Sequence, residues 1–359
     1  PERWNFSENT DLSEVLFVAR KTSRTLSDAR TLYVNLWRNP DNPVDALMTA
    51  EAIREAGYAT AQGEVSVHPL WVGDEKMGEV VTVPWARLRQ MGHWMSPCSF
   101  AQGELVQTLW SLLENHRWQG VAVPLCELGQ LGELGPDIRR LWATFDVVDQ
   151  PPGSPAVWGH DSEKAFTMSL QPNSYLVRRA VPKEKQTPDY YKTLLAQAGN
   201  LIIVERMWLN TQRLTAAWLP EPVLAASWWP LRLKEGMDDS AGKSLVLWMN
   251  STLGTMLLIG SRLETRGAWT KFKKPTLLAM PVLDVRALDS HALQHLAQAF
   301  DHLCEQPLLP LPQMAQDATR IAIDDALCEA LRLPDLSPLR TALAREPVVC
   351  LQPLRQRRR

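Results

Sequence analysis

The first part of the chain combines short apolar runs with one amphipathic helix. Residues 14–19 and 31–37 are β-rich apolar runs bounded by polar positions, which predicts two strands. An Asn-Pro start and a closing glycine predict a helix over residues 42–57. The apolar side chains that we expect on its buried face are Val44, Leu47, Met48 and Ile53. Residues 64–68 and 79–84 predict another pair of strands, connected through a turn at Gly73 and Asp74.

The rest of the chain alternates helical and strand-like patterns. Apolar positions at helical spacing predict a long connecting helix over residues 99–116. Short β-rich runs then follow, and the clearest of these are 200–206, 213–219 and 222–229. A helix is predicted over 240–261, and the chain after Asp284 has a helical pattern. The uncharged run inside the 240–261 helix contains Asn, Ser and Thr, so we expect a buried helix and no membrane span.

Composition and charge limit the classes of function. A length of 359 residues predicts two or three domains, and the formal net charge of −2 excludes a protein that binds polyanions over its whole surface. Of the 38 basic residues 27 are Arg, and the chain has 15 Trp against 5 Tyr and 7 Phe, a bias typical of planar recognition. Five cysteines without CxxC spacing and a first segment without a signal-peptide pattern favour the cytoplasm.

The sequence contains no pattern of a self-contained enzyme. It has no GxGxxG, GxxxxGK[ST], HExxH or GxSxG motif, so we assign no catalytic residue. His291 and His295 are four residues apart, but no acidic residue lies between them, and we assign no metal site.

A basic stripe over residues 262–274 is the strongest candidate for a binding site. It holds five basic residues and one acidic residue, a net charge of +4 over 13 residues of an otherwise acidic chain. Its basic residues are Arg262, Arg266, Lys271, Lys273 and Lys274. Trp269 lies between them, so the stripe suits contact with nucleic-acid phosphates beside an aromatic ring. A solvated loop anchored by its aromatic residues is the equally weighted alternative.

A second candidate is the sequence NTQR at residues 210–213. Asn210, Gln212 and Arg213 carry the amide and guanidinium donors that bind the edges of adenine and guanine. We predict that these three side chains contact bases.

Three segments carry a resemblance to a known family. WNFSENTDLSEVLFVARK at residues 4–21 resembles the segment that follows the catalytic strand in N6-adenine DNA methyltransferases of restriction-modification and phage-defence systems. SLVLWMNSTLGTMLL at 244–258 is similar to a helix of their target-recognition domains. KFKKPTLLAMPVLD at 271–284 resembles the exit from such a domain, a feature shared with type I specificity subunits. The three segments occur in the family's order.

The resemblance implies that the catalytic half lies elsewhere. The family binds S-adenosylmethionine with a Gly-containing loop and positions a flipped adenine with [DNS]PP[YFW], and both motifs precede the segment at residues 4–21. Neither motif is present. The PP pair of this chain lies between Gln150 and Gly153, and so does not match [DNS]PP[YFW]. We therefore expect no cofactor in this chain, S-adenosylmethionine in the complete enzyme, and no methylation by this chain alone.

Together these patterns predict an α/β fold in four regions. Residues 1–92 are expected to be the last strands of a methyltransferase-like sheet, 93–120 a helical connector, 121–285 a mixed α+β target-recognition domain, and 286–359 a helical region with a basic tail. The predicted function is DNA recognition for N6-adenine methylation. The predicted partners are double-stranded DNA and the missing catalytic half or other defence-system subunits, without a membrane. The alternative is a scaffold subunit that binds protein through Trp residues and never contacts DNA.

Overall fold

The structure is a computed structural model. It describes residues 18, 29–58, 65–89, 94, 96–159, 162–181, 187, 189–262 and 269–357. The predicted strand at 14–19, nearly all of the methyltransferase-like segment at 4–21, and Arg266 of the basic stripe lie outside these residues.

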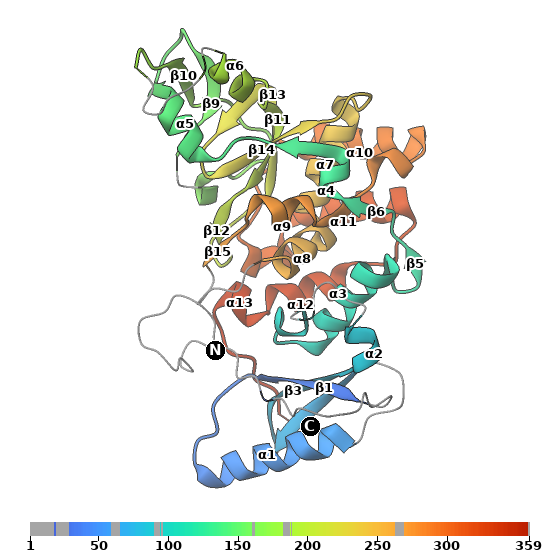
Figure 1. Ribbon diagram of the computed structural model, residues 1–359. Helices are drawn as coiled ribbons and strands as arrows, with labels where there is room; N and C mark the ends of the chain where they lie inside the picture. The colour runs from blue at the N-terminus through green and yellow to red at the C-terminus, as the bar shows by residue number, and fades with distance from the viewer. Residues whose placement is uncertain are drawn as a thin grey trace.

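The N-terminal region is a small antiparallel sheet with a helix on one face (Figure 1). Its elements are β1 (Arg30–Leu36), α1 (Pro43–Tyr58), β2 (Ser66–Val72) and β3 (Glu75–Pro84). The strand order is β1-β3-β2, and Gly73 makes the hairpin turn with a φ of 59°. The predicted strands at 31–37, 64–68 and 79–84 are thus confirmed approximately. The methyltransferase-like sheet is not confirmed, since these three strands form an antiparallel sheet of their own.

Helix α1 begins where the sequence indicates but turns a different face to the sheet. Asn42 Oδ1 accepts hydrogen bonds from the amides of Val44 (2.9 Å) and Asp45 (3.0 Å), which caps the helix. The prediction of its buried face was wrong in part, because Val44, Leu47 and Met48 are exposed. The sheet contacts the side of the helix that carries small residues, which allows close packing. The α1 side chains in this contact include Ala52, Ile53 and Ala56.

A helical segment connects the small sheet to the rest of the molecule. It comprises α2 (Trp85–Leu88), the 3-10 turn η1 (Ser96–Cys98) and α3 (Gly103–Asn115). The predicted helix at 99–116 is confirmed as α3, which ends at His116 in the left-handed conformation. A Cβ at Gly103 would lie 2.3 Å from the Val67 side chain, so glycine allows α3 to approach the sheet closely.

The largest sheet has seven strands in the order β7-β14-β11-β13-β9-β10-β8. The strands are β7 (Gly132–Leu134), β8 (Phe145–Val148), β9 (Ser154–Val157), β10 (Ser174–Arg178), β11 (Gly199–Val204), β13 (Ala216–Ala225) and β14 (Trp228–Leu233). All pairings are antiparallel except β13 with β9. The fold is therefore a mixed α/β fold with a mixed sheet.

Two predictions on this sheet needed correction. The runs at 213–219 and 222–229 are not two separate strands, because β13 continues through Pro220 and Pro222 and takes residues from both runs. The last two residues of the second run begin β14. Both prolines lie in the exposed part of β13, opposite a register shift in β11, where a strand tolerates residues without an N–H group.

Short elements complete the middle of the chain. They are β4 (Arg117–Trp118), β5 (Val121–Ala122), β6 (Leu125–Glu127), α4 (Leu128–Leu131), α5 (Ile138–Thr144), η2 (Ser162–Lys164), α6 (Tyr190–Leu195), β12 (Arg206–Trp208), β15 (Trp269–Lys271), α9 (Lys274–Leu278), β16 (Pro281–Leu283) and η3 (Val285–Ala287). Strand β4 pairs with β5, β6 with β16, and β12 with β15.

The predicted helix at 240–261 is two helices, α7 (Asp239–Asn250) and α8 (Thr252–Gly260). Ser251 between them has extended backbone, and its side chain accepts a hydrogen bond from the amide of Gly254, which caps α8. None of the described helices has the length and apolar character that crossing a bilayer requires.

The C-terminal region is helical, as predicted. Its elements are α10 (Ser290–Leu303), η4 (Leu311–Gln316), α11 (Ala318–Leu331), α12 (Ser337–Ala344) and α13 (Pro347–Cys350). Helix α10 packs on α7 and α11, and α12 packs on α3 and α8. One hydrophobic core takes side chains from all four predicted regions, from Tyr33 to Val349. The predicted domain boundaries stay a prediction.

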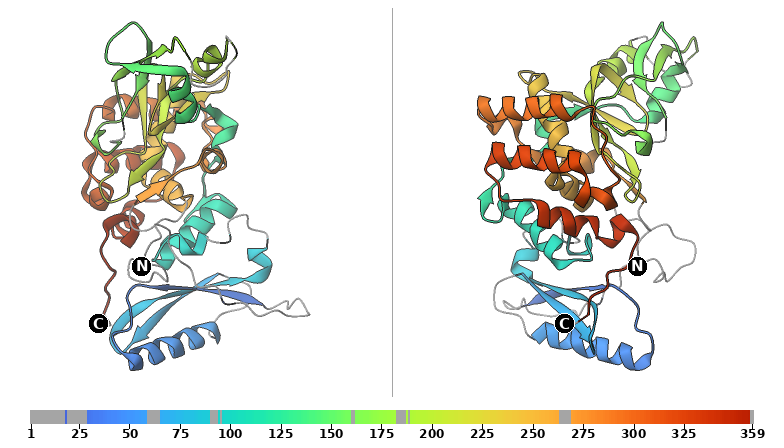
Figure 2. Two further views of the ribbon diagram at one scale, coloured as in Figure 1. Left: turned by 60° about the vertical axis from the view of Figure 1, so that its left-hand side comes forward. Right: turned by 180° about the vertical axis from the view of Figure 1, so that it is seen from behind.

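Beyond α13 the chain returns to the N-terminal sheet (Figures 1 and 2). The Lys76 amide donates to the carbonyl oxygen of Gln356 (2.9 Å), and Arg357 Nη2 lies 3.2 Å from Glu75 Oε1. The C-terminal end of the described chain is therefore attached to the N-terminal sheet.

A buried polar network surrounds the break between α7 and α8, and we call it the polar joint. Its members are Asn250, Thr252, Arg320, Asp324 and Arg340. The Asp324 carboxylate accepts hydrogen bonds from the Thr252 amide (2.8 Å), from Thr252 Oγ1 (2.5 Å) and from Arg340 Nη1 (2.6 Å). Arg320 is fully buried and donates to the carbonyl oxygen of Asn250. Segment 244–258, which is similar to a helix of target-recognition domains, thus contributes Asn250 and Thr252 to this network.

Candidate nucleic-acid interface

Part of the basic stripe lies on a two-stranded ribbon formed by β12 and β15. Arg206 is paired with Lys271, Met207 with Thr270, and Trp208 with Trp269. Because directly opposed residues point to the same side, one face carries Met207 and Thr270, which are 2% and 0% exposed. The other face, which we call the ribbon face, carries two cations and two tryptophans. Its members are Arg206, Trp208, Trp269 and Lys271.

The ribbon face presents one exposed ring and one half-exposed ammonium group. Trp208 is 51% exposed, and the Lys271 side chain is 47% exposed. Lys271 Nζ lies 3.2 Å from Oε1 of the buried Glu205, and Arg206 Nη2 donates to Ser227 Oγ at 3.3 Å. The Lys271 ammonium group is half-exposed, so it can contact a phosphate while it stays paired with Glu205, whose buried carboxylate would be costly to leave unpaired.

The ribbon itself is anchored to the large sheet. The Phe272 amide donates to the Glu205 carbonyl oxygen (2.7 Å), and Trp229 Nε1 donates to the Phe272 carbonyl oxygen (3.1 Å). Phe272 is fully buried. The ribbon face is therefore presented by a fixed element, as binding residues require.

The other stripe residues do not gather on the ribbon face. Lys273 follows β15 and is exposed. Lys274 Nζ donates to the carbonyl oxygens of Leu134 (2.6 Å) and Gly135 (3.1 Å). Arg262 Nη1 and Nη2 donate to the carbonyl oxygens of Ile259 and Ser99, both at 2.8 Å, at the end of α8. The ribbon therefore collects only part of the predicted stripe.

The NTQR segment forms the turn after β12, and its Gln212 side chain points into the protein. Gln212 is fully buried, and Nε2 donates to the Leu214 carbonyl oxygen (2.6 Å) while Oε1 accepts from Ser162 Oγ (3.1 Å). A carboxamide bound in this way is not available to a base edge, which corrects the prediction for Gln212.

The two neighbours of Gln212 are half-buried. Arg213 Nη1 donates to the Leu308 carbonyl oxygen (3.1 Å), and its guanidinium lies 4.6 Å from the centre of the Phe166 ring. Asn210 has its Oδ1 buried without a partner among the described residues. Both lie beside the ribbon, and neither is on the ribbon face.

The sequence prediction missed Arg206 and Trp208. Each alternates with a buried residue, as do Trp269 and Lys271, and this period of two is the signal of a strand with one exposed face. In three-residue strands the signal is too short to be recognised without knowing the pairing partner.

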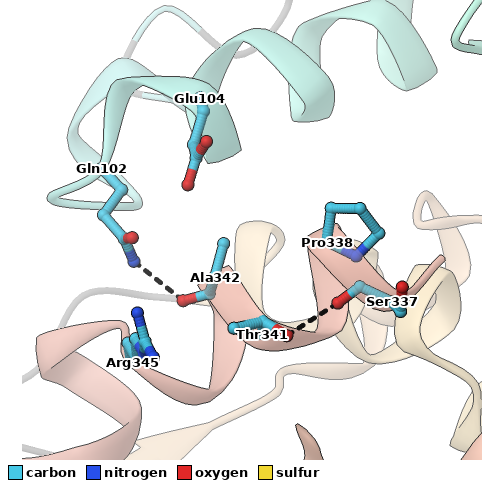
Figure 3. Close-up of a pocket in the computed structure, with 7 residues that line it drawn as sticks. All are labelled: Gln102, Glu104, Ser337, Pro338, Thr341, Ala342 and Arg345. Carbon is cyan, nitrogen blue, oxygen red and sulfur yellow. Dashed lines mark hydrogen bonds between the residues drawn. The ribbon is translucent and has the colours of Figure 1, made fainter.

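Two adjoining hollows lie in the groove between α3 and α12. Figure 3 shows the residues that line one of them. The two hollows have volumes of about 290 and 350 Å³, and both are lined by Glu104, Pro338 and Ala342. Gln102 Nε2 donates to the Ala342 carbonyl oxygen (2.9 Å) across one of them. The lining contains no His or Cys, and its one carboxylate is that of Glu104, so the groove lacks a catalytic set.

Metal ligands do not cluster in the part of the chain that the structure describes. There, no three His, Cys, Asp or Glu side chains are placed to share an ion. Burial raises the pKa of Cys126 and of Cys328 to about 11, so these thiols are protonated and unreactive at neutral pH.

Comparison with known proteins finds similarity in structure but not in sequence. No known protein family and no curated protein matches the sequence. Among solved structures, the chain is similar to the crystal structure of the HsdS subunit from Thermoanaerobacter tengcongensis, with 12% identity and a TM-score of 0.27. The match covers 69% of this chain and 55% of the HsdS chain, so this chain spans about half the length of that protein.

Proposed function

We propose that this chain is the DNA-recognition part of an N6-adenine DNA methyltransferase of a restriction-modification or phage-defence system. The ribbon face is its contact with duplex DNA. The observation that carries the proposal is the gathering of Arg206, Trp208, Trp269 and Lys271 on one face, on which Trp208 and Lys271 are exposed, opposite a buried face. The resemblance of three segments, in the right order, to that family supports the same function.

The ribbon has the dimensions and chemistry for this task. The major groove of B-DNA admits a two-stranded ribbon, and β-ribbons bind DNA in either groove. Lys271 and Arg206 supply charge for phosphates, and Trp208 and Trp269 supply flat apolar surface for sugars and bases. Because net charge is −2, attraction to DNA must come from such a local cluster.

The groove between α3 and α12 does not fit S-adenosylmethionine. A nucleotide site in an α/β fold needs a Gly-containing loop after a strand and an acidic residue for the ribose. The groove between α3 and α12 offers no glycine and one carboxylate, that of Glu104. In our proposal the cofactor and the chemistry belong to the missing catalytic half or another subunit, which is also the protein partner.

The test is the salt dependence of binding to a short duplex DNA of mixed sequence. Removal of one phosphate contact lowers the slope of log affinity against log salt by about 0.9. We expect the variant Lys271→Gln/Lys273→Gln to lower the slope by up to about 1.8 and to weaken all sequences alike. The control variant Arg54→Gln/Arg332→Gln removes the same charge from α1 and from the end of α11, and its slope should equal that of the wild type.

Two results would overturn the proposal. One is a wild-type chain that does not bind duplex DNA in a salt-dependent manner. The other is an unchanged slope in the lysine variant. Partner binding that is insensitive to salt would instead favour the scaffold function, because an apolar protein interface releases few counterions.

A further inference from the structure

Helix α5 exposes two arginines and a tryptophan that the proposed function does not use. Arg139 and Arg140 are exposed, and Trp142 is 43% exposed on the same helix. The carboxylates near α5 are engaged, because Glu133 pairs with Arg232 (2.8 Å) and Asp146 pairs with Arg179 (3.0 Å). Asp137 Oδ1 accepts from the Arg139 amide (2.8 Å), which caps the helix. Among the described residues, no ion pair neutralises the two exposed guanidinium groups.

The helix is held in a fixed position. Arg179 Nε donates to the carbonyl oxygens of Trp142 and Phe145, both at 3.1 Å, and so joins the end of α5 to β10. The Trp142 ring meets the Trp158 ring edge to face, with centroids 5.2 Å apart. Arg139, Arg140 and Trp142 are therefore presented by a rigid element, as the ribbon face is.

The two basic elements are connected through Lys274. Its ammonium group donates to Leu134 and Gly135, just before α5, and Lys274 itself follows the ribbon by three residues. Burial lowers the pKa of Lys274, and the positive charge of Arg140 lowers it further. Like charges are thus crowded between the ribbon and α5. Figures 1 and 2 show both elements on the same side of the molecule.

We propose that α5 is a second DNA contact, at which Arg139 and Arg140 bind the phosphate backbone of the duplex held by the ribbon face. Trp142 packs against the sugars beside these phosphates. The basic track formed by Lys271, Lys273, Arg139 and Arg140 then sets the direction of the duplex across the large sheet. This inference rests on the proposed function, and it adds a site outside the basic stripe.

Charge and geometry favour DNA backbone as the ligand. A duplex presents phosphates at short regular intervals, so cations on two separate rigid elements can bind it at once. Phosphate contacts fix the position of a protein on DNA without reading its sequence. Exposed Arg side chains with an adjacent Trp suit that role, since guanidinium groups bind phosphate with two hydrogen bonds.

The experiment compares Arg139→Gln/Arg140→Gln with the wild type on the same mixed-sequence duplex. We expect the salt slope to fall by up to about 1.8. Hydroxyl-radical footprinting should show protection lost at one end of the protected segment, whereas Lys271→Gln/Lys273→Gln should remove protection elsewhere in it. Arg139→Lys/Arg140→Lys keeps the charge and should retain most of the slope. Equal thermal midpoints of these variants would show that the fold is intact.

The outcomes separate this inference from the proposed function. Suppose that Lys271→Gln/Lys273→Gln lowers the salt slope, whereas Arg139→Gln/Arg140→Gln keeps both the slope and the footprint of the wild type. Then only the α5 contact is wrong. If the wild-type chain does not bind duplex DNA, the proposed function fails as well. A loss of affinity for duplex RNA in the α5 variant, with unchanged affinity for duplex DNA, would overturn the assignment to DNA.

Discussion

The polar joint and the ribbon face both concentrate charged side chains, and they differ in what surrounds those charges. Arg320 and Asp324 of the joint are 0% and 1% exposed, and both Nη atoms of Arg320 and both carboxylate oxygens of Asp324 are hydrogen-bonded to protein groups. On the ribbon face, by contrast, half of the Lys271 side chain is exposed. Burial of a charge is costly unless the charge is paired, whereas an exposed cation can bind a phosphate of a ligand. Exposure, more than residue type, therefore separates structural cations from those available to DNA.

The largest effect that we predict tests the buried side of this comparison. The variant Asp324→Ala leaves Arg340 and Thr252 without their buried partner. Removal of one member of a buried charged pair costs about 3–5 kcal/mol, and we expect that loss in the free energy of unfolding, measured by urea denaturation. The matched control is Asp325→Ala at the exposed neighbouring position, which should change stability by less than about 0.5 kcal/mol. Equal stabilities of the two variants would show that charge pairing does not hold the joint together.

Local sequence signals predicted the local parts of the fold. The cap at Asn42 and the turn at Gly73 depend on a few neighbouring residues, and both occur where the sequence placed them. The break at Ser251 was missed because the uncharged run continues through it, and Asp324, which binds the next residue Thr252, is 72 residues away from Thr252 in the sequence. The inward face of α1 was also predicted incorrectly, since small residues there pack closer than the larger apolar ones.

The candidate interface was predictable only in part for the same reason. Trp269 and Lys271 were identified from local charge, but their partners Trp208 and Arg206 come from a strand about sixty residues earlier in the chain. Gln212 has the chemistry of a base-reading residue and is nevertheless fully buried. No local pattern indicates which polar side chains of the NTQR turn face inward, because that depends on η2 and β13 packing around it.

The second prediction tests whether Gln212 belongs to the buried class. Its carboxamide bonds to Leu214 and Ser162, so Gln212→Ala leaves buried polar groups without partners. We expect a loss of about 1–3 kcal/mol in the free energy of unfolding. Under conditions where the variant is folded, its preference among DNA sequences should equal that of the wild type. An unchanged unfolding free energy together with altered base preference would return Gln212 to the DNA-reading class.

The third prediction concerns Glu346, a buried carboxyl group that connects the C-terminal helices to the start of α3. Its oxygens accept from the amide of Ala101 (2.7 Å) and from Nε2 of Gln102 (3.0 Å). Burial raises the pKa of Glu346, and these hydrogen bonds lower it by less. The folded state therefore binds the Glu346 proton more tightly than the unfolded state does. In the unfolded state the pKa of this group is about 4.3. This contribution to stability is complete below that pKa and is lost as pH rises through the folded-state pKa.

The variant Glu346→Gln isolates this effect, because a carboxamide stays neutral at every pH. The difference in unfolding free energy, wild type minus variant, should decrease as pH rises above about 4.3, by no more than about 1.4 kcal/mol per pH unit. It should become constant above the folded-state pKa. Urea denaturation of both proteins across this pH range measures the difference directly, and other titrating groups cancel. A difference that increases with pH would mean that the amides of Ala101 and Gln102, with the charge of Arg262, hold the carboxylate ionised. Glu346 would then belong with the paired charges of the polar joint.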